Sequence, residues 1–324
     1  MSIAVITLCV LGRPVRKAKL NSTRLDLLAR AAEAAARLSG GGADAVLTPA
    51  GFLKLKLKLG FLSWSQRISE VGEHSVGRAC QSIAGQLEAA SGAKLVVGFD
   101  TISYGGFGPD QMIAVFNGDR VVGCIRKAFP SASDASGETV RPYRVFEHDA
   151  CAAGRTARLG SAVAALGVCY DGFAFVEAWV GPTAKRRHIA YVADDQIGWR
   201  WANTAEQNAI VNEFARINQS KPGLALIAIH GFERPGRELY WQRHGIAAAS
   251  AALGGALVVG AAHYAKRLPD PEAALAGTLA AIDVPKDHLW AGLRRKAYGL
   301  RPERWTYVRD QFGVPVGLLR LFQT

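Results

Sequence analysis

Short apolar segments alternate along the chain with longer segments whose apolar residues recur at helical spacing. Over Arg24–Leu38 the apolar side chains fall on one helical face, and the run Gly40-Gly41-Gly42 ends the pattern. This alternation is typical of α/β proteins. It predicts strands at Ile3–Leu8, Asp44–Thr48, Lys94–Gly98, Ala162–Tyr170, Leu224–His230, Ala256–His263 and within Ala273–Asp283, and helices at Arg24–Leu38, within Ser65–Ala90, Ala205–Asn218 and Gly236–Leu253.

Two further segments have a local pattern of their own. Met112–Phe116 and Arg120–Lys127 are joined through Asn117-Gly118-Asp119, which predicts a tight hairpin because Asn-Gly supplies positive φ angles. Lys and Leu alternate over Lys54–Leu59, which predicts an extended edge with one solvent-facing side. A dedicated anion site is the less favoured interpretation of these lysines.

The chain has neither an internal repeat nor a Pro/Ser-rich linker, and we therefore expect one domain over residues 1–287. Residues 130–160 are polar and small, which predicts a loop. His288–Thr324 is basic and aromatic, and we expect it to form a C-terminal extension that packs at an oligomer interface.

Composition excludes some classes of protein. The 324 residues are 49% hydrophobic, which is enough for a sizeable core and excludes a disordered chain. Lys and Arg number 39 against 27 Asp and Glu, giving a formal net charge of +12. Such a charge points to nucleic acid or another anionic partner. However, the sequence contains no recognised nucleic-acid module, and we favour the interface interpretation for the basic, aromatic C-terminal segment.

The sequence also indicates where the protein is located in the cell and in which state its cysteines are. The apolar start lacks a preceding basic region, and no run reaches the length of a membrane span. The longest apolar run, Gly245–Ala262, is interpreted as a buried helix followed by a strand. The five cysteines are scattered without a CxxC pair, which predicts reduced thiols in a cytoplasmic protein with neither a metal site nor a cofactor.

Three strand ends carry residues suited to chemistry. A predicted strand leads into Thr48-Pro49-Ala50-Gly51, the hairpin ends in Arg126-Lys127, and a buried strand ends in Gly167-Val168-Cys169-Tyr170-Asp171. Residues at the carboxyl ends of strands converge on the ligand crevice of α/β sheets. A cysteine at such a turn is held exposed, as in elbow-type nucleophile sites.

These three segments, in this order, resemble the motifs of the nitrilase, or carbon–nitrogen hydrolase, superfamily. The resemblance covers most of residues 1–285 and implies a four-layer α-β-β-α sandwich with two mixed sheets, which commonly pairs as a homodimer or larger homo-oligomer. It implies that Cys169 is a nucleophile toward an amide or nitrile, that Lys127 stabilises negative charge, and that the Tyr170 N–H completes an oxyanion hole.

The resemblance breaks at the general base. The family has Glu where this chain has Ala50, and a methyl group cannot transfer a proton. Asp134 is our candidate for a relocated base, and Glu138 lies in the same loop. Other carboxylates near the motifs are interpreted as surface charges: Glu70, Glu73 and Glu177.

Two functions therefore stay open. The first is thiol-dependent hydrolysis or acyl transfer through a covalent intermediate at Cys169. Aromatic residues that could line an apolar pocket for its substrate are Tyr104, Phe107, Phe173 and Trp179, and a basic insertion at residues 178–203 would lie near its mouth. The second is a catalytically degenerate protein that keeps the fold and acts by ligand binding or assembly.

Overall fold

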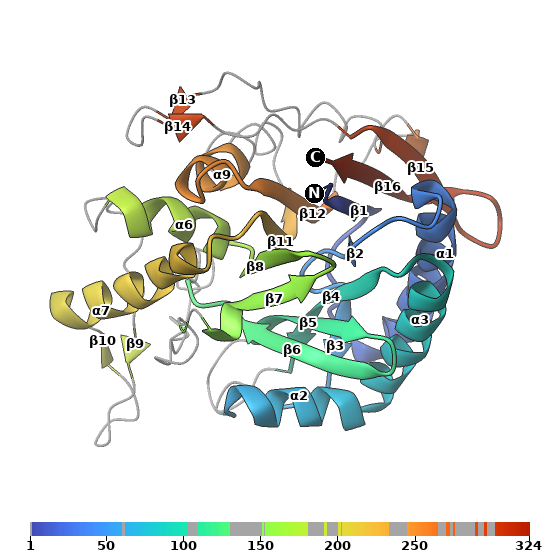
Figure 1. The fold of residues 1–324 in the computed structure, drawn as a ribbon. Helices are drawn as coiled ribbons and strands as arrows, with labels where there is room; N and C mark the ends of the chain where they lie inside the picture. The colour runs from blue at the N-terminus through green and yellow to red at the C-terminus, as the bar shows by residue number, and fades with distance from the viewer. Residues whose placement is uncertain are drawn as a thin grey trace.

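A computed structural model of the chain describes residues 2–59, 62–102, 109–129, 151, 153–180, 191–192, 200–201, 203–232, 245–264, 270–272, 275, 289–290, 295–296 and 302–324. Over these residues the protein is a mixed α/β fold in which a large mixed sheet is covered by helices, as the alternating pattern predicts (Figure 1).

One half of the sheet is built around strand β1. In this half β1 lies between β2 and β16, and β4, β5 and β6 continue the order outward from β2. Its parallel pairs are β1–β2, β2–β4 and β3–β4, whereas β5, β6, β15 and β16 pair antiparallel. The strands are β1 (Ala4–Leu11), β2 (Ala45–Leu47), β3 (Leu53–Leu55), β4 (Lys94–Thr101), β5 (Gln111–Asn117), β6 (Arg120–Arg126), β15 (Arg304–Arg309) and β16 (Pro315–Gln323).

The other half contains β12 (Leu257–Tyr264), β11 (Leu224–Phe232), β8 (Ala162–Val168) and β7 (Thr156–Leu159), in that order. The first three are parallel and β7 is antiparallel. The two halves meet at the end of β1, where Val10 and Leu11 pair with β12 beyond the end of β2, while Val10 stays paired with Gly317 of β16. Twelve of the described strands therefore form one hydrogen-bonded network, in which the two halves are joined through β1 and β12.

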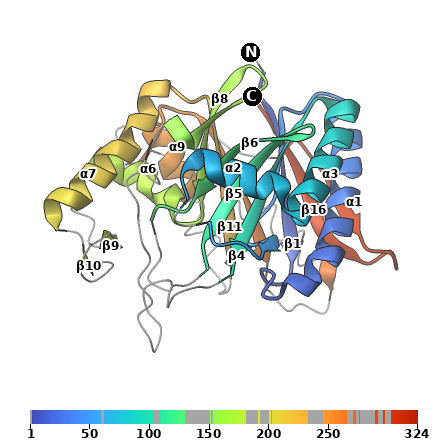
Figure 2. The same cartoon turned by 90° about the horizontal axis from the view of Figure 1, so that it is seen from below.

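The two halves pack face to face, with helices on both outer sides. α1 (Asn21–Ser39) and α3 (Ser75–Ser91) cover one outer face, whereas α6 (Asp171–Val180), α7 (Thr204–Ala215) and α9 (Ala248–Ala252) cover the other (Figures 1 and 2). Alternation along β1 explains the layers, because Val5 packs with the inner core and Ile6 and Leu8 pack toward α1. This arrangement confirms the expected α-β-β-α layering.

Local signals account for the ends of several elements. α1 ends at Gly40, which takes the left-handed conformation with φ +62° that favours glycine. The predicted helix within Ser65–Ala90 is two helices, α2 (Trp64–Glu73) and α3, which break at His74; Ser63 caps α2 in a capping box with Gln66. The predicted hairpin is confirmed, since Asn117 pairs with Arg120 around Gly118.

Two segments differ from the prediction. They are the end of the loop predicted over 130–160 and the end of the expected C-terminal extension, and both contain strands. Thr156–Leu159 forms β7. β16 pairs with β1 along Ala4–Val10, so residues 304–323 belong to the main sheet. Any role of this segment at an oligomer interface, homodimer formation and a cytoplasmic location stay predictions.

Short elements complete the described structure: η1 (Ala18–Leu20), η2 (Ala153–Arg155), η3 (Arg216–Ser220) and the two-residue strands β9 (Tyr191–Val192), β10 (Arg200–Trp201), β13 (Leu289–Trp290) and β14 (Arg295–Lys296). β9 and β10, which pair with each other, lie within the predicted 178–203 insertion. Most of the strand predicted within Ala273–Asp283 lies outside the described residues. No helix of the described part is long and apolar enough to cross a membrane.

Candidate functional site

Cys169 lies at a sharp turn between a buried strand and a helix. It follows β8, its N–H donates to the carbonyl of Ala228 on β11 over 2.7 Å, and its own carbonyl accepts from Gly172 as α6 begins. Its φ of +50° is unusual for a residue with a side chain and costs roughly 1–3 kcal/mol. This strained, half-buried strand-to-helix turn has the geometry of a nucleophile elbow, as predicted.

Asp171 fixes that turn to the neighbouring hairpin. This wholly buried carboxylate accepts hydrogen bonds from the backbone N–H groups of Ala128, Phe129 and Val168 and from the guanidinium of Arg155. Arg155 also donates to the carbonyl of Arg126. One carboxylate thus ties the residues just before Cys169 to those just after Lys127.

Lys127 lies at the end of the hairpin, as predicted, and its side chain is buried. Its ammonium group donates to the side-chain oxygen of Gln111 over 2.9 Å, and its backbone N–H donates to the Gln111 carbonyl over 2.8 Å. A fixed cation in a buried position stabilises negative charge more strongly than one in water.

His230 is a titratable side chain that the structure places beside Cys169. It is at the end of β11, where the pairing with β12 is irregular between Ile229 and Phe232, and such irregularities redirect side chains next to active sites. Its Nε2 lies 2.8 Å from Oδ1 of Asp100, on β4. The same imidazole neighbours the Cys169 side chain, and the two groups shift each other's pKa. Cys169, His230 and Asp100 therefore form a series of neighbouring groups, with a hydrogen bond between His230 and Asp100.

The electrostatics of this series favour a thiolate–imidazolium pair. Burial alone would raise the pKa of Cys169, but the charge of Lys127 and the charge and hydrogen bonds of His230 outweigh it and lower that pKa. Burial would likewise lower the pKa of His230, but the charge and hydrogen bond of Asp100 and the contact with Cys169 raise it to about 10. A thiolate is the form of cysteine that attacks carbon.

A glycine lets the backbone approach this pair closely. Gly51 has φ +65°, and a Cβ there would lie 2.9 Å from both Asp100 Oδ2 and His230 Nε2 and 2.8 Å from Pro14 Cβ. The preceding Ala50 is wholly buried in the core between the sheet halves. The turn formed by Ala50 and Gly51 is thus next to the imidazole of His230.

A second histidine lies near this site. Burial lowers the pKa of His263 well below its usual value, and the charges of Arg24 and His230 act in the same direction. Its imidazole is therefore neutral, which leaves His230 as the protonated ring.

The remaining predicted site residues have different outcomes. Phe173 is buried and Tyr170 half-buried, with their rings 4.8 Å apart beside Cys169. Glu70 and Glu73 are exposed on α2, as expected. Positions outside the described residues are Asp134, Glu138, Tyr104 and Phe107, and the side chains of Glu177 and Trp179 are likewise not described. The roles of Asp134 and Glu138, and of the Tyr170 N–H, stay predictions.

The sequence analysis missed His230 and Asp100, although a signal for both was present. His230 ends one predicted strand, Leu224–His230, and Asp100 follows another, Lys94–Gly98. These are the same strand-end positions that singled out Cys169 and Lys127. What the pattern could not supply is which strand ends lie together.

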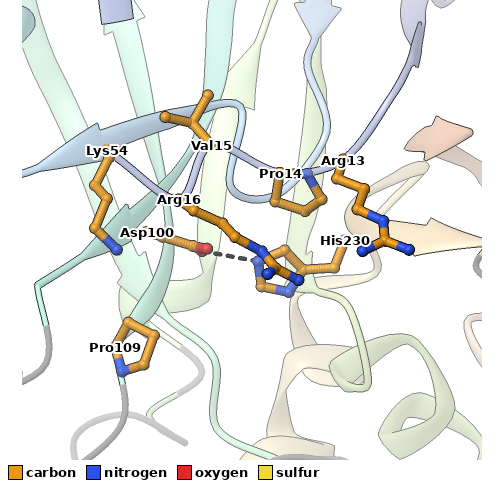
Figure 3. Close-up of a pocket in the computed structure, with 8 residues that line it drawn as sticks. All are labelled: Arg13, Pro14, Val15, Arg16, Lys54, Asp100, Pro109 and His230. Atoms are coloured by element: carbon orange, nitrogen blue, oxygen red, sulfur yellow. Dashed lines mark hydrogen bonds and ion pairs between the residues drawn. The ribbon is translucent and has the colours of Figure 1, made fainter. Parts of the chain in front are cut away.

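A cavity of about 220 Å³ opens beside the histidine. It is lined by Arg13, Pro14, Val15, Arg16, Lys54, Asp100, Pro109 and His230 (Figure 3). Among the described residues no group of three or more His, Cys, Asp or Glu side chains could hold a metal ion. The site therefore combines a cysteine of lowered pKa, an imidazole of raised pKa and an adjoining space for a small ligand.

Comparison with known proteins gives neither a matching family model nor a matching curated protein. Solved structures do match. A mutant of the amidase from Nesterenkonia sp. AN1, with acrylamide added at its active-site cysteine, is 14% identical, with 98% of this chain and 92% of that chain covered and a TM-score of 0.45.

Two further structures of that amidase give similar values, and the first of the two is described as an amidase from the nitrilase superfamily. One mutant is 16% identical over 81% of this chain and 77% of that chain, with a TM-score of 0.43. A double mutant in complex with acrylamide is 13% identical over 98% and 90%, with a TM-score of 0.46. What this chain does has to be inferred from the geometry of its own site.

Proposed function

We propose that this protein is a thiol-dependent hydrolase or acyltransferase that acts on the C–N bond of a small amide or nitrile. The observation that carries the proposal is the placement of His230, which is hydrogen bonded to Asp100 and neighbours Cys169 at the ends of adjacent parallel strands. A nucleophile, a base within reach of it and a third group that orients the base are the elements of nucleophilic catalysis.

For an amide, the steps follow from these positions. The Cys169 thiolate attacks the carbonyl carbon and forms a tetrahedral intermediate, whose negative oxygen is stabilised by the nearby Lys127 ammonium. His230 gives its proton to the departing amine as the C–N bond breaks, leaving a thioester. The neutral imidazole then takes a proton from water or from an acceptor nucleophile, which attacks the thioester and releases the acyl group. Asp100 stabilises the imidazolium throughout.

In this proposal His230 is the acid–base group, in place of Asp134, the candidate that the sequence suggested. A degenerate protein without turnover is the competing interpretation, and its prediction is that Cys169 reacts with an electrophile but no amide is hydrolysed.

The test combines turnover with labelling. Ammonia release from a panel of short amides should be abolished in Cys169→Ala and reduced by about 10²–10⁴-fold in His230→Gln. Asp134→Asn should reduce it far less. Intact-protein mass spectrometry with chloroacetamide should show rapid labelling that Cys169→Ala removes and that Cys151→Ala, the matched control at another half-buried cysteine, retains.

Two results would contradict the proposal. If Asp134→Asn abolishes turnover while His230→Gln retains it, the assigned base is wrong. If the unmodified chain labels at Cys169 but hydrolyses none of the amides, the degenerate interpretation holds.

A further inference from the structure

The cavity beside His230 carries an excess of positive charge. Arg13 and Arg16 reach it from the segment between β1 and η1, and Lys54 reaches it from β3 (Figure 3). The acidic group in its lining is Asp100, whose Oδ1 is already bonded to His230. The cavity therefore presents three cations around a carboxylate–imidazole pair.

These cations have no carboxylate partner within the part of the chain that the structure describes. None of the ion pairs there includes Arg13, Arg16 or Lys54. Like charges that share a small space repel each other, and the repulsion is relieved when an anion enters. Arginine is also the side chain best suited to bind a carboxylate or phosphate through two parallel hydrogen bonds.

Backbone contacts hold the basic residues in place. Gly12 N–H donates to the Tyr264 carbonyl over 3.0 Å, and Val15 N–H donates to the Gly51 carbonyl over 2.9 Å, so the backbone is held on both sides of Arg13 and directly before Arg16. The backbone of Lys54 is held by two hydrogen bonds with the Asn21 side chain, of 2.7 and 2.9 Å. The basic groups are thus attached to an ordered backbone, which lowers the entropy cost of binding.

The position and size of the cavity define what would enter it. His230 lines the cavity and neighbours Cys169, whose pKa it lowers, so a group bound there lies on the imidazole side of the site; Cys169 itself is not part of the lining. About 220 Å³ is less than the roughly 300–1,000 Å³ of pockets for drug-sized ligands, which favours a small charged group on a short chain.

We infer that the substrate is an amide that carries an anionic group, a carboxylate or a phosphate, which Arg13, Arg16 and Lys54 hold beside the bond that Cys169 attacks. This inference rests on the proposed function for the reaction, and it adds the class of substrate.

Matched substrates test it. Butyramide and succinamate are short amides that differ in a terminal methyl or carboxylate, and 3-phosphonopropanamide carries a phosphonate instead. The kcat/KM for an anionic amide should exceed that for butyramide by about tenfold or more, and the excess should shrink as salt screens the charges. A preference for succinamate identifies a carboxylate group, and one for the phosphonate identifies a phosphate-like group.

Variants locate the preference. Arg16→Gln, Arg13→Gln and Lys54→Met should each lower the ratio of kcat/KM for the preferred anionic amide to that for butyramide by about tenfold. Arg120→Gln, which removes the same charge from an exposed position on β6, should leave the ratio unchanged. Equal use of the anionic and neutral amides, or an unchanged ratio in all three cavity variants, would overturn the inference.

A readout without turnover separates this inference from the proposed function. Iodoacetate and iodoacetamide have similar size and differ by one charge, and peptide mass spectrometry gives their rates at each cysteine. The iodoacetate-to-iodoacetamide rate ratio should be higher at Cys169 than at half-buried Cys151, and Arg16→Gln should remove the difference. If no amide is hydrolysed, the proposed function fails while this ratio still decides whether the cavity selects anions; equal ratios at the two cysteines overturn the inference.

Discussion

At the scale of single residues, the site differs from the resembled motif at one position, Ala50, and a titratable side chain on another strand, His230, lies beside Cys169 instead. Ala50 cannot move a proton, but His230 neighbours Cys169 and is hydrogen bonded to the carboxylate of Asp100. Two backbone features accompany this arrangement, the positive φ of Cys169 and the close approach of Gly51 to Asp100 and His230. Titration tests the coupling of Cys169, His230 and Asp100, and substitution tests the close approach at Gly51.

The pH dependence of turnover should be bell-shaped. Activity rises as pH passes the lowered pKa of Cys169, where the thiolate forms, and it falls as pH passes about 10, where His230 loses the proton that the leaving amine needs. Asp100→Asn removes the charge that raises the pKa of His230, so the falling limb should move to lower pH. The rising limb should move to higher pH, because less imidazolium remains to stabilise the thiolate.

The measurement is kcat/KM as a function of pH, together with the rate of Cys169 alkylation by iodoacetamide. Asp119→Asn, at an exposed carboxylate on the hairpin turn, is the control and should move neither limb. Limbs that stay in place in Asp100→Asn would show that Asp100 does not govern the histidine.

Gly51→Ala should damage the site more than it damages the fold. The new Cβ would meet Asp100, His230 and Pro14 within 3 Å, so the Asp100–His230 hydrogen bond must open. We expect activity to fall by at least about tenfold, with a loss of roughly 1–3 kcal/mol in the free energy of unfolding. Gly40→Ala is the matched control, because Gly40 has nearly the same φ, +62°, and no atom within 4 Å of a Cβ. Equal loss of activity in both variants would contradict this explanation.

At the scale of elements, the site is assembled from the ends of strands in both halves of the sheet. β8 and β11 are adjacent and parallel, so Cys169 and His230 leave the same edge. Lys54 on β3, Asp100 on β4 and Gln111 on β5 are partners in register and therefore lie in one row. Lys54 lines the cavity, Asp100 is bonded to His230, and Gln111 is bonded to Lys127. The buried Asp171 then fixes the Cys169 turn to the end of β6.

Asp171→Asn should loosen this junction. The substitution leaves the buried guanidinium of Arg155 without its counter-charge and weakens acceptance of three backbone N–H groups. Breaking a buried ion pair by removing one partner costs about 3–5 kcal/mol. Urea unfolding should therefore show a loss of that size, whereas the exposed control Asp119→Asn should change the free energy by less than about 0.5 kcal/mol. A loss as small as that of the control would show that Asp171 does not hold the turn.

At the scale of the whole molecule, the two chain ends close the sheet. β16 pairs with β1 along seven registered residues, and Thr324 and Ile3 exchange hydrogen bonds of 3.0 and 3.1 Å. Arg320 is wholly buried and donates to Thr7 and to the Gly260 carbonyl, which links β16 to β1 and β12. The C-terminal strands are thus part of the core.

A chain that ends at residue 302 should fail to reach the native fold. Removing β15 and β16 exposes the long edge of β1 and the apolar residues that pack against Leu318, Leu319 and Leu321. Circular dichroism and size-exclusion chromatography should show an unfolded or aggregated chain. Phe312→Ser, on the exposed β15–β16 turn, is the control and should keep the thermal transition. A truncated chain that folds normally but forms smaller oligomers would instead support the interface role of this segment.

Much of the fold was predictable from sequence because its signals are local. Helical spacing over Arg24–Leu38, the Asn-Gly hairpin and the buried apolar strands each depend on a few neighbouring residues. The same holds for Cys169 and Lys127, since a turn directly after a strand identifies a residue at the edge of a sheet. The alternation at Lys54 indicated a solvent-facing side, but whether that side faces bulk water or a cavity depends on the segment opposite.

Sequence by itself determined the α/β class, the order of elements and the candidate thiol. Only the tertiary structure brought His230 and Asp100 together beside that thiol, because they are 130 positions apart and meet through the packing of two sheet halves. It likewise decided that the basic C-terminal segment completes the sheet and that Arg13, Arg16 and Lys54 face one cavity. Periodicity records which face of a strand is buried, whereas the pairing of distant strand ends is set by long-range packing.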